Sequence, residues 1–235
     1  SNVTIEFSED VAGFDASDVS VTGGVLSDFA IIDENSFTAT FTADDDAEAT
    51  GSVSVGTGYT DLAGNVGAAG SDTVAIDTHN PTVTVNVVDT ALNDADRASN
   101  VTIEFSEDVA GFDVSDVSVT GGVLSNFSII DGNSFSATFT ADDSVETTGS
   151  VSVGTAYTDV AGNAGAGGSD TVLIDTLNPT VTVNIVDTKL DAGDNSSDVT
   201  FEFSEDVTGF DDADVTVSGG MLSDITRIDG NSFRA

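Results

Sequence analysis

Hydrophobic and polar residues alternate over most of this chain, with a period of two residues. Seven short runs between residues 78 and 175 show the pattern, and Thr and Ser fill the positions between the apolar residues. A period of two is typical of a β-strand with one buried face, and no segment has the apolar stripe of a helix. The runs predict strands over residues 82–88, 100–107, 116–120, 123–131, 134–140, 150–158 and 170–175.

The same alternation predicts which side chains form the core. Gly121-Gly122 and Asp131-Gly132-Asn133 are typical of turns between two of the strands. Seven short strands in about 100 residues indicate an all-β fold, a β-sandwich of the immunoglobulin type. The predicted inward-facing residues are Val83, Val85, Val87, Val101, Ile103, Phe105, Val117, Val119, Phe127, Ile129, Phe135, Ala137, Phe139, Val151, Val153, Val172 and Ile174, with Ile130 beside them.

The chain repeats itself with a period of 98 residues, because the run Ser1–Glu9 returns at Ser99–Glu107 and, slightly changed, at Ser197–Glu205. A period near 100 fits a self-standing domain rather than a solenoid repeat. Pro81 and Pro179 mark the boundaries. We predict immunoglobulin-like domains in tandem, arranged as a linear rod: residues 1–77 lack a first strand, 78–175 are complete, and 176–235 lack the last two strands.

The chain is strongly acidic, with 42 Asp and Glu against 4 Lys and Arg, a net charge of −38. This charge disfavours nucleic acid and anionic membrane surfaces as partners, and it favours cations. Solubility alone is the alternative reading. There is no Cys for a disulfide and no apolar run long enough to insert into a membrane. The first residue already lies in a strand pattern without a signal peptide, so we expect a piece of a longer protein.

Loops at alternate ends of a sandwich should gather acidic side chains at the end where the preceding domain arrives. Such a cluster repels itself, and a divalent cation such as Ca²⁺ relieves the repulsion. The predicted ligands in the complete domain are Glu107, Asp108, Asp159 and Asn163, with Asp77 and Asn80 from the incoming linker. Their counterparts in the other repeats are Glu9, Asp61, Asp175, Asn178, Glu205 and Asp206.

Turn capping is the alternative for some of these residues. Asp113 and Asp116 could cap a turn in Gly-Phe-Asp-Val-Ser-Asp, and Asn163 follows a Gly in a tight turn. Glu107 and Asp159 have no evident capping role, so the sequence favours metal binding for this pair.

A second acidic group is predicted at the opposite end of the sandwich, between the first two strands. Its shared oxygen pattern is Asp89, Asn93 and Asp96 in one repeat and Asp187, Asp191 and Asp194 in the next. Asp94 is a weaker candidate, because Ala192 replaces it. The spacing is not that of an EF-hand, and a solvated acidic turn remains the alternative.

Catalysis is not expected. The same acids recur in every copy, no Trp is available to stack on a sugar, and the single histidine, His79, is replaced by Leu177 in the next linker.

Four motifs recur along the chain: Phe-Ser-Glu-Asp-Val-x-Gly-Phe-Asp, Asp-Val-Ser-Val-Thr-Gly-Gly, Tyr-Thr-Asp-x-Ala-Gly-Asn and Ser-Asp-Thr-Val-x-Ile-Asp-Thr-x-x-Pro. They resemble the bacterial Ig-like repeats of giant surface adhesins, such as repeats-in-toxin adhesins, biofilm-associated proteins and an ice-binding adhesin. The resemblance covers the whole chain. The Gly-Gly-x-Gly-x-Asp repeat of the family's secretion region is absent.

The resemblance implies an extracellular stalk on a bacterial surface, in which repeats hold a distal binding domain away from the cell and calcium stiffens the junctions. It assigns the junction ligands to Asp77, Asp175, Glu107, Asp159 and Glu205. The expected partners are neighbouring repeats and Ca²⁺, in a monomeric chain. The alternative is a repeat that itself binds a glycan, ice or another cell surface.

Overall fold

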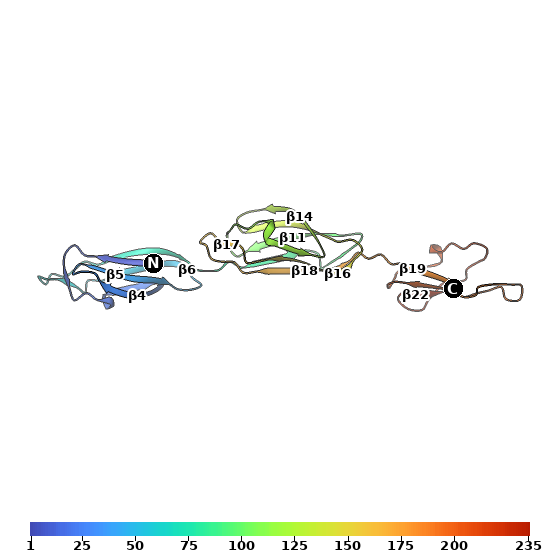
Figure 1. The fold of residues 1–235 in the computed structure, drawn as a ribbon, viewed down its shortest axis with the longest axis horizontal. Coiled ribbons are helices and arrows are strands. Elements are labelled where there is room, and N and C mark those ends of the chain that lie inside the picture. Colours follow the sequence, from blue (N-terminus) through green and yellow to red (C-terminus); the bar gives the residue numbers. More distant parts are fainter.

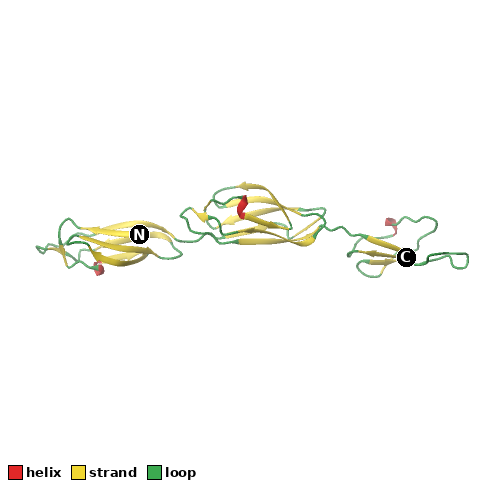
Figure 2. Cartoon of the chain, in the orientation of Figure 1, coloured by secondary structure: helices red, strands yellow, loops and turns green.

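The computed structural model describes residues 1–235 as three β-domains that follow one another in a line (Figure 1). Strands and loops make up almost all of the chain, and each domain has only one short 3₁₀ turn (Figure 2). The predicted all-β fold, with immunoglobulin-like sandwiches in tandem, is confirmed.

The middle domain is the complete sandwich. One sheet has the strand order β14-β15-β11-β9 and the other has the order β10-β18-β16-β13. A small pair, β12 and β17, lies at the end of the domain that faces the first domain (Figure 1). Its elements are β9 (Val83–Val87), β10 (Ala91–Asn93), β11 (Ala98–Phe105), β12 (Val109–Ala110), the 3₁₀ turn η2 (Val114–Asp116), β13 (Val117–Thr120), β14 (Gly122–Ile129), β15 (Ser134–Ala141), β16 (Glu146–Val153), β17 (Thr158–Asp159) and β18 (Gly168–Asp175).

The flanking domains contain parts of the same plan. The first has the sheets β1-β5-β4 and β3-β6-β8 with the pair β2-β7, and the third has one sheet, β19-β20-β22-β21. The elements of the first are β1 (Asn2–Glu6), β2 (Val11–Ala12), η1 (Ala16–Asp18), β3 (Val19–Thr22), β4 (Gly24–Ile31), β5 (Ser36–Ala43), β6 (Glu48–Val55), β7 (Thr60–Asp61) and β8 (Gly70–Asp77). Those of the third are β19 (Val181–Ile185), β20 (Val199–Phe203), η3 (Asp212–Asp214), β21 (Thr226–Arg227) and β22 (Ser232–Arg234).

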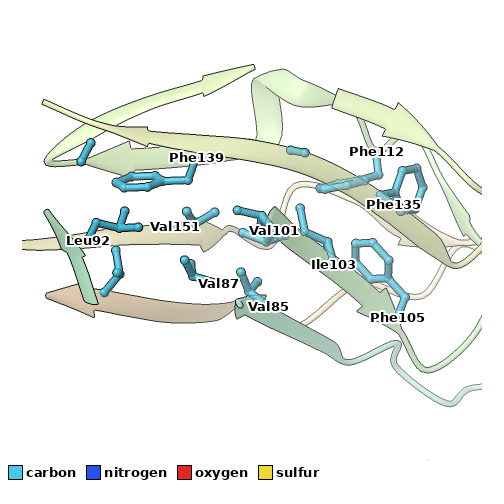
Figure 3. Packing of buried hydrophobic residues seen from close by; sticks show 14 of the residues in the cluster. Val85, Val87, Leu92, Val101, Ile103, Phe105, Phe112, Phe135, Phe139 and Val151 are labelled. Atoms are coloured by element: carbon cyan, nitrogen blue, oxygen red, sulfur yellow. The ribbon is translucent and has the colours of Figure 1, made fainter. Parts of the chain in front are cut away.

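The core of the middle domain lies between its two sheets (Figure 3). Alternate residues of each strand enter it, and Val101, Ile103, Phe139 and Val151 are fully buried. At the end nearest the first domain the core becomes aromatic, where Phe105 packs edge-on against Tyr157 with ring centroids 4.7 Å apart. The alternation therefore predicts most of the core correctly.

One predicted pair of core residues is wrong. Ile129 and Ile130 are 65% and 63% exposed. The pairing of β14 with β15 shifts register between Ser125 and Ser128, and Asn126 takes a left-handed conformation with φ of 52°. The bulge adds a residue to β14 and leaves Ile129 opposite the buried Phe135, on the core face. Ile129 is nevertheless the last residue of this edge strand and Ile130 lies beyond it, so neither side chain is covered.

Strand boundaries also differ from the prediction. The predicted strand over 150–158 is two strands, β16 and β17, and β16 begins at Glu146. The first predicted strand, β9, is followed along the chain by a strand that was not predicted, β10. This strand pairs in parallel with β18 in the opposite sheet. The chain thus crosses from one sheet to the other between Val87 and Ala91.

Candidate functional site

The acidic cluster predicted at the first junction is present. Asp77 ends β8 of the first domain, Glu107 follows β11, and Asp159 ends β17. One carboxylate oxygen of each lies within 4.8 Å of the others, and no other three acidic or histidine side chains of the chain come together in this way. Because the three come from two domains and three separate segments, the cluster depends on how the domains meet.

Asp159 has a structural role that the sequence did not suggest. The side chain is only 2% exposed. Its Oδ1 accepts hydrogen bonds from the backbone N–H of Gly162 at 2.6 Å and of Asn163 at 2.8 Å. The inference that Asp159 has no capping role is therefore wrong: it closes the turn Asp-Val-Ala-Gly-Asn. Burial raises the pKa of Asp159, but the hydrogen bonds from Asn163 and Gly162 outweigh burial and lower it, so the side chain is ionised at neutral pH.

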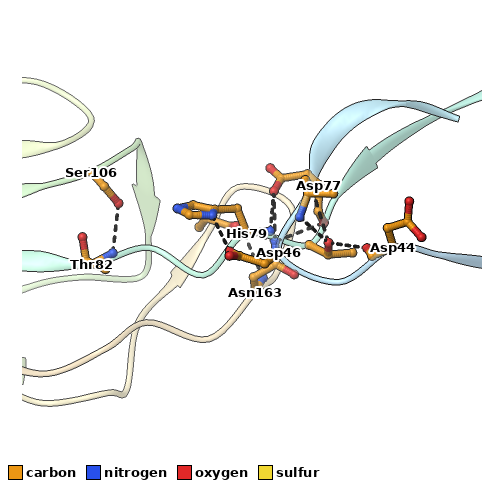
Figure 4. Close-up of polar contacts among 10 residues, drawn as sticks. Asp44, Asp46, Asp77, His79, Thr82, Ser106 and Asn163 are labelled. Carbon is orange, nitrogen blue, oxygen red and sulfur yellow. Dashed lines mark hydrogen bonds and ion pairs between the residues drawn. The ribbon is translucent and has the colours of Figure 1, made fainter. Parts of the chain in front are cut away.

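Asn163 connects the two domains. Its Nδ2 donates to Asp159 Oδ2 at 2.7 Å, to the backbone oxygen of Asp77 at 3.1 Å and to Asp77 Oδ1 at 3.3 Å. Figure 4 shows Asn163 beside Asp77 in this contact. Asn163 therefore faces the cluster with its donor nitrogen, and in this arrangement it positions the carboxylates instead of offering an oxygen ligand.

Glu107 is the carboxylate without a partner. Its Oε1 is buried and accepts no hydrogen bond. Burial raises the pKa of Glu107, and the nearby charges of Asp159 and Asp77 raise it further. A buried carboxylate oxygen without a donor is costly, and a cation among three carboxylates would remove that cost. The donor set, all hard oxygens, fits Ca²⁺.

The remaining predicted junction residues lie outside this cluster. Asn80 and Asp108 are exposed. At the second junction Asp175 and Asn178 are exposed, whereas Glu205 repeats the feature of Glu107, a buried Oε1 without a hydrogen-bond partner; its neighbour Asp206 is exposed. In the first domain Glu9 is exposed, and Asp61 closes the same turn as Asp159 by accepting from Asn65.

At the opposite end of the sandwich the structure gathers no comparable cluster. Asn93 Oδ1 accepts from the N–H groups of Ala95 and Asp96, both at 3.0 Å, and Asp191 Oδ1 accepts from Gly193 at 2.9 Å. These residues close turns, as the solvated-turn alternative requires. Asp96, Asp187 and Asp194 are exposed and Asp89 is half-buried, and none of them belongs to a group of three acids. Metal binding at this end stays a prediction.

Asp113 and Asp116 are caps. Asp113 Oδ1 accepts from the N–H of Ser115 at 2.7 Å, and Asp116 Oδ2 accepts from the N–H of Asp113 at 2.9 Å. The two bonds form a capping box around η2. Hydrogen bonds from the Ser115 side chain and backbone lower the pKa of Asp113. The capping alternative is therefore correct for this pair.

The sequence did not reveal the residues that anchor the linker. On the first-domain side, Thr78 Oγ1 donates to the backbone oxygen of Asp44 at 2.9 Å, and His79 Nδ1 lies 2.7 Å from Asp46 Oδ1. On the middle-domain side, Ser106 Oγ accepts from the N–H of Thr82 at 2.9 Å (Figure 4). Tyr157, which is buried, donates to the backbone oxygen of Ala166 at 2.7 Å, and its hydroxyl oxygen lies 3.3 Å from the backbone oxygen of Pro81. Thr78 and Ser106 lie in the runs Ile-Asp-Thr and Phe-Ser-Glu, which recur in the repeats, and this recurrence is the sequence feature that could have pointed to them.

The contact of Asn163 with Asp77 leads to a prediction about metal-free protein. With a chelator present, Asn163→Ala should let the first and middle domains reorient more independently, because one link across the junction is lost. The measurement is the rotational correlation time of each domain from ¹⁵N relaxation. Asn65→Ala is the matched control, since Asn65 holds the same turn in the first domain but contacts no linker. Equal effects of the two variants would contradict the link.

Comparison with known proteins places the chain in a family. The model of the bacterial Ig-like domain matches residues 1–76, 77–174 and 175–235. The chain therefore belongs to the bacterial Ig-like domain family. No curated protein sequence matches it.

Two solved structures are similar to it. InvD of Yersinia pseudotuberculosis is 18% identical with a TM-score of 0.35 over 87% of this chain and 64% of that one. Domains 4–9 of the surface layer protein SbsC are 14% identical with a TM-score of 0.26 over 95% of this chain and 35% of that one. The chain thus spans less than two thirds of either structure. No helix of the chain is long and apolar enough to cross a membrane.

Proposed function

We propose that this chain is a stalk segment of a bacterial surface protein of the adhesin type, in which Ca²⁺ at the domain junctions holds successive sandwiches in line. The observation that carries the proposal is the buried, unpartnered Glu107 Oε1 beside Asp77 and Asp159. The cluster spans a junction, so a bound cation would tie the linker of one domain to the loops of the next. The segment then has no catalytic role, and its location is outside the cell.

The geometry of the junction supports stiffening. Only five residues separate β8 from β9, and a proline restricts the exit of this linker. Both ends of the linker are already hydrogen-bonded to the domains that they join. A cation would add a contact at the middle of the junction, where the carboxylates otherwise repel one another.

The alternative function, a repeat that binds a glycan, ice or another cell by itself, has less support. No Phe or Tyr is among the exposed large side chains, and the rings pack inside the domains. The exposed Thr and Ser rows are those of any solvated sheet. We therefore infer that the expected partners are neighbouring repeats and Ca²⁺, in a monomeric chain.

Small-angle scattering tests the proposed function. The chain should keep its full maximum dimension in millimolar Ca²⁺ and sample shorter, bent shapes after chelation. Asp77→Ala should move the Ca²⁺ sample part of the way toward the chelated one, because it removes the linker's ligand at the first of the two junctions. Asn80→Ala is the control, since Asn80 lies in the same linker but outside the cluster. A chain that stays equally extended after chelation would leave only a passive spacer.

A further inference from the structure

The body of the middle domain has a feature that is independent of the junction cluster: how its first strands are attached. β9 pairs with β11 in antiparallel fashion over five residues, from Val83 with Phe105 to Val87 with Val101. The chain then crosses to the other sheet, where β10 pairs in parallel with β18 from Ala91 with Leu173 to Asn93 with Asp175. The entering strands are thus fixed to both sheets.

A side chain joins the two attachments at the crossing. Asp170 of β18 accepts a hydrogen bond through Oδ2 from the backbone N–H of Val87 at 2.9 Å. Val87 is buried at the end of β9, and β18 belongs to the opposite sheet. The pairing of β9 with β11 supplies no acceptor for this N–H. Without Asp170, the Val87 N–H would therefore be unpaired at the point where β9 leaves its sheet.

The direction of the strands decides how a pulling force would act on them. The chain enters the domain at Thr82 and leaves it after Asp175, at opposite ends of the sandwich (Figure 1). Because β10 and β18 are parallel, tension pulls them in opposite directions along their length. Their hydrogen bonds, including the one from the N–H of Leu173 to the oxygen of Thr90 at 3.1 Å, are then loaded together in shear and do not open one at a time.

Side-chain packing also resists sliding. Val85, Val87 and Leu92 are buried between the sheets. A slip by one residue would turn this apolar set toward the solvent, so the strands must move by at least two residues, about 7 Å, to reach a new register. The exit is fixed too: Thr176 is fully buried, and its Oγ1 donates to the backbone oxygen of Asp142 at 2.8 Å.

We propose that β9 and β10, tied to β18 by Asp170, form a mechanical clamp that bears tension along the chain and that must break before the rest of the domain unfolds. The clamp goes beyond the proposed function, because it lies within one domain and needs no metal.

Force spectroscopy on the whole chain in chelator tests the clamp. The middle domain is recognised by its gain in length, roughly 300 Å for residues 78–175 at about 3.3–3.6 Å per residue less the folded span. At constant load, Asp170→Ala should raise its unfolding rate at least about tenfold, because a buried N–H loses its acceptor. Asp170→Asn, which retains an oxygen, should stay within about threefold of the natural chain.

Val119→Ala is the matched control. Val119 packs against the same core from β13, at the far edge of the β10-β18-β16-β13 sheet. Urea unfolding gives the equilibrium loss of each variant. For Asp170→Ala, the lost stability should appear as faster unfolding under load. For Val119→Ala, the unfolding rate under load should hardly change, since β13 stays in place when the clamp breaks.

If Asp170→Ala does not fold, Leu92→Val on β10 carries the same expectation. The clamp is overturned if the clamp variant leaves the loaded rate unchanged, or if Val119→Ala raises it as much for the same equilibrium loss. Neither result depends on Ca²⁺, so failure of the clamp is distinct from failure of the proposed junction metal.

Discussion

Calcium should raise the melting temperature of the chain by about 6–20 °C at about 10 mM. Sites of the affinity common in extracellular modules, about 10⁻⁴–10⁻³ M, stabilise the folded state by about 1.4–2.7 kcal/mol at that concentration. For a domain of this size each kcal/mol moves the melting temperature by about 4–8 °C. Magnesium should have a smaller effect, because it gives up its water ligands reluctantly. Calorimetry with Ca²⁺, with Mg²⁺ and with chelator measures the difference.

Glu107→Gln should change this result in two opposite ways. In chelator the variant should melt higher than the natural chain, because the cluster loses a charge that burial and its neighbours disfavour. In Ca²⁺ it should melt lower, because the cation loses a ligand. Glu9→Gln is the matched control: Glu9 occupies the same motif, yet it is exposed and belongs to no group of three acidic side chains. Identical melting in Ca²⁺ and chelator, or equal behaviour of the two variants, would contradict the metal site.

Phe139→Ala should reduce the free energy of unfolding of the middle domain by about 3–5 kcal/mol. Phe139 of β15 is fully buried, and its ring reaches under Gly122 and Gly149, where an added Cβ would come within 2.9 Å of it. Truncation leaves a cavity that the rigid strands around it cannot close. Urea unfolding, followed by a probe in the middle domain, gives the loss.

Ile129→Ala provides the comparison for Phe139→Ala. The alternation predicts both residues in the core, but Ile129 lies exposed beyond the bulge of β14. Its truncation should change the free energy of unfolding by less than about 0.5 kcal/mol. A loss of several kcal/mol for Ile129→Ala would mean that the end of β14 is buried and not exposed.

Much of the fold could be predicted because it depends on local pattern. Alternation with a period of two identifies buried strands wherever one face meets the core and the other meets water, so Val101, Ile103 and Phe139 were predicted correctly. The pattern failed at Ile129 because alternation assigns a side chain to a face but does not say whether that face is covered: Ile129 lies opposite the buried Phe135, yet it ends an edge strand and stays exposed. It also did not predict β10, whose three residues join β18 through backbone pairing that no local signal specifies.

The sequence by itself determined the repeat period, the all-β class, the acidic surface and the residue types able to hold a hard cation, since each follows from composition and order along one chain. Only the tertiary structure decided which carboxylates meet. Asp77, Glu107 and Asp159 come from segments up to 82 positions apart, and the folding of two domains against a short linker brings them together. It also assigned Asp159 and Asn163 to a hydrogen-bonded turn and left Glu107 Oε1 without a partner, because those roles depend on which donors surround each oxygen in space.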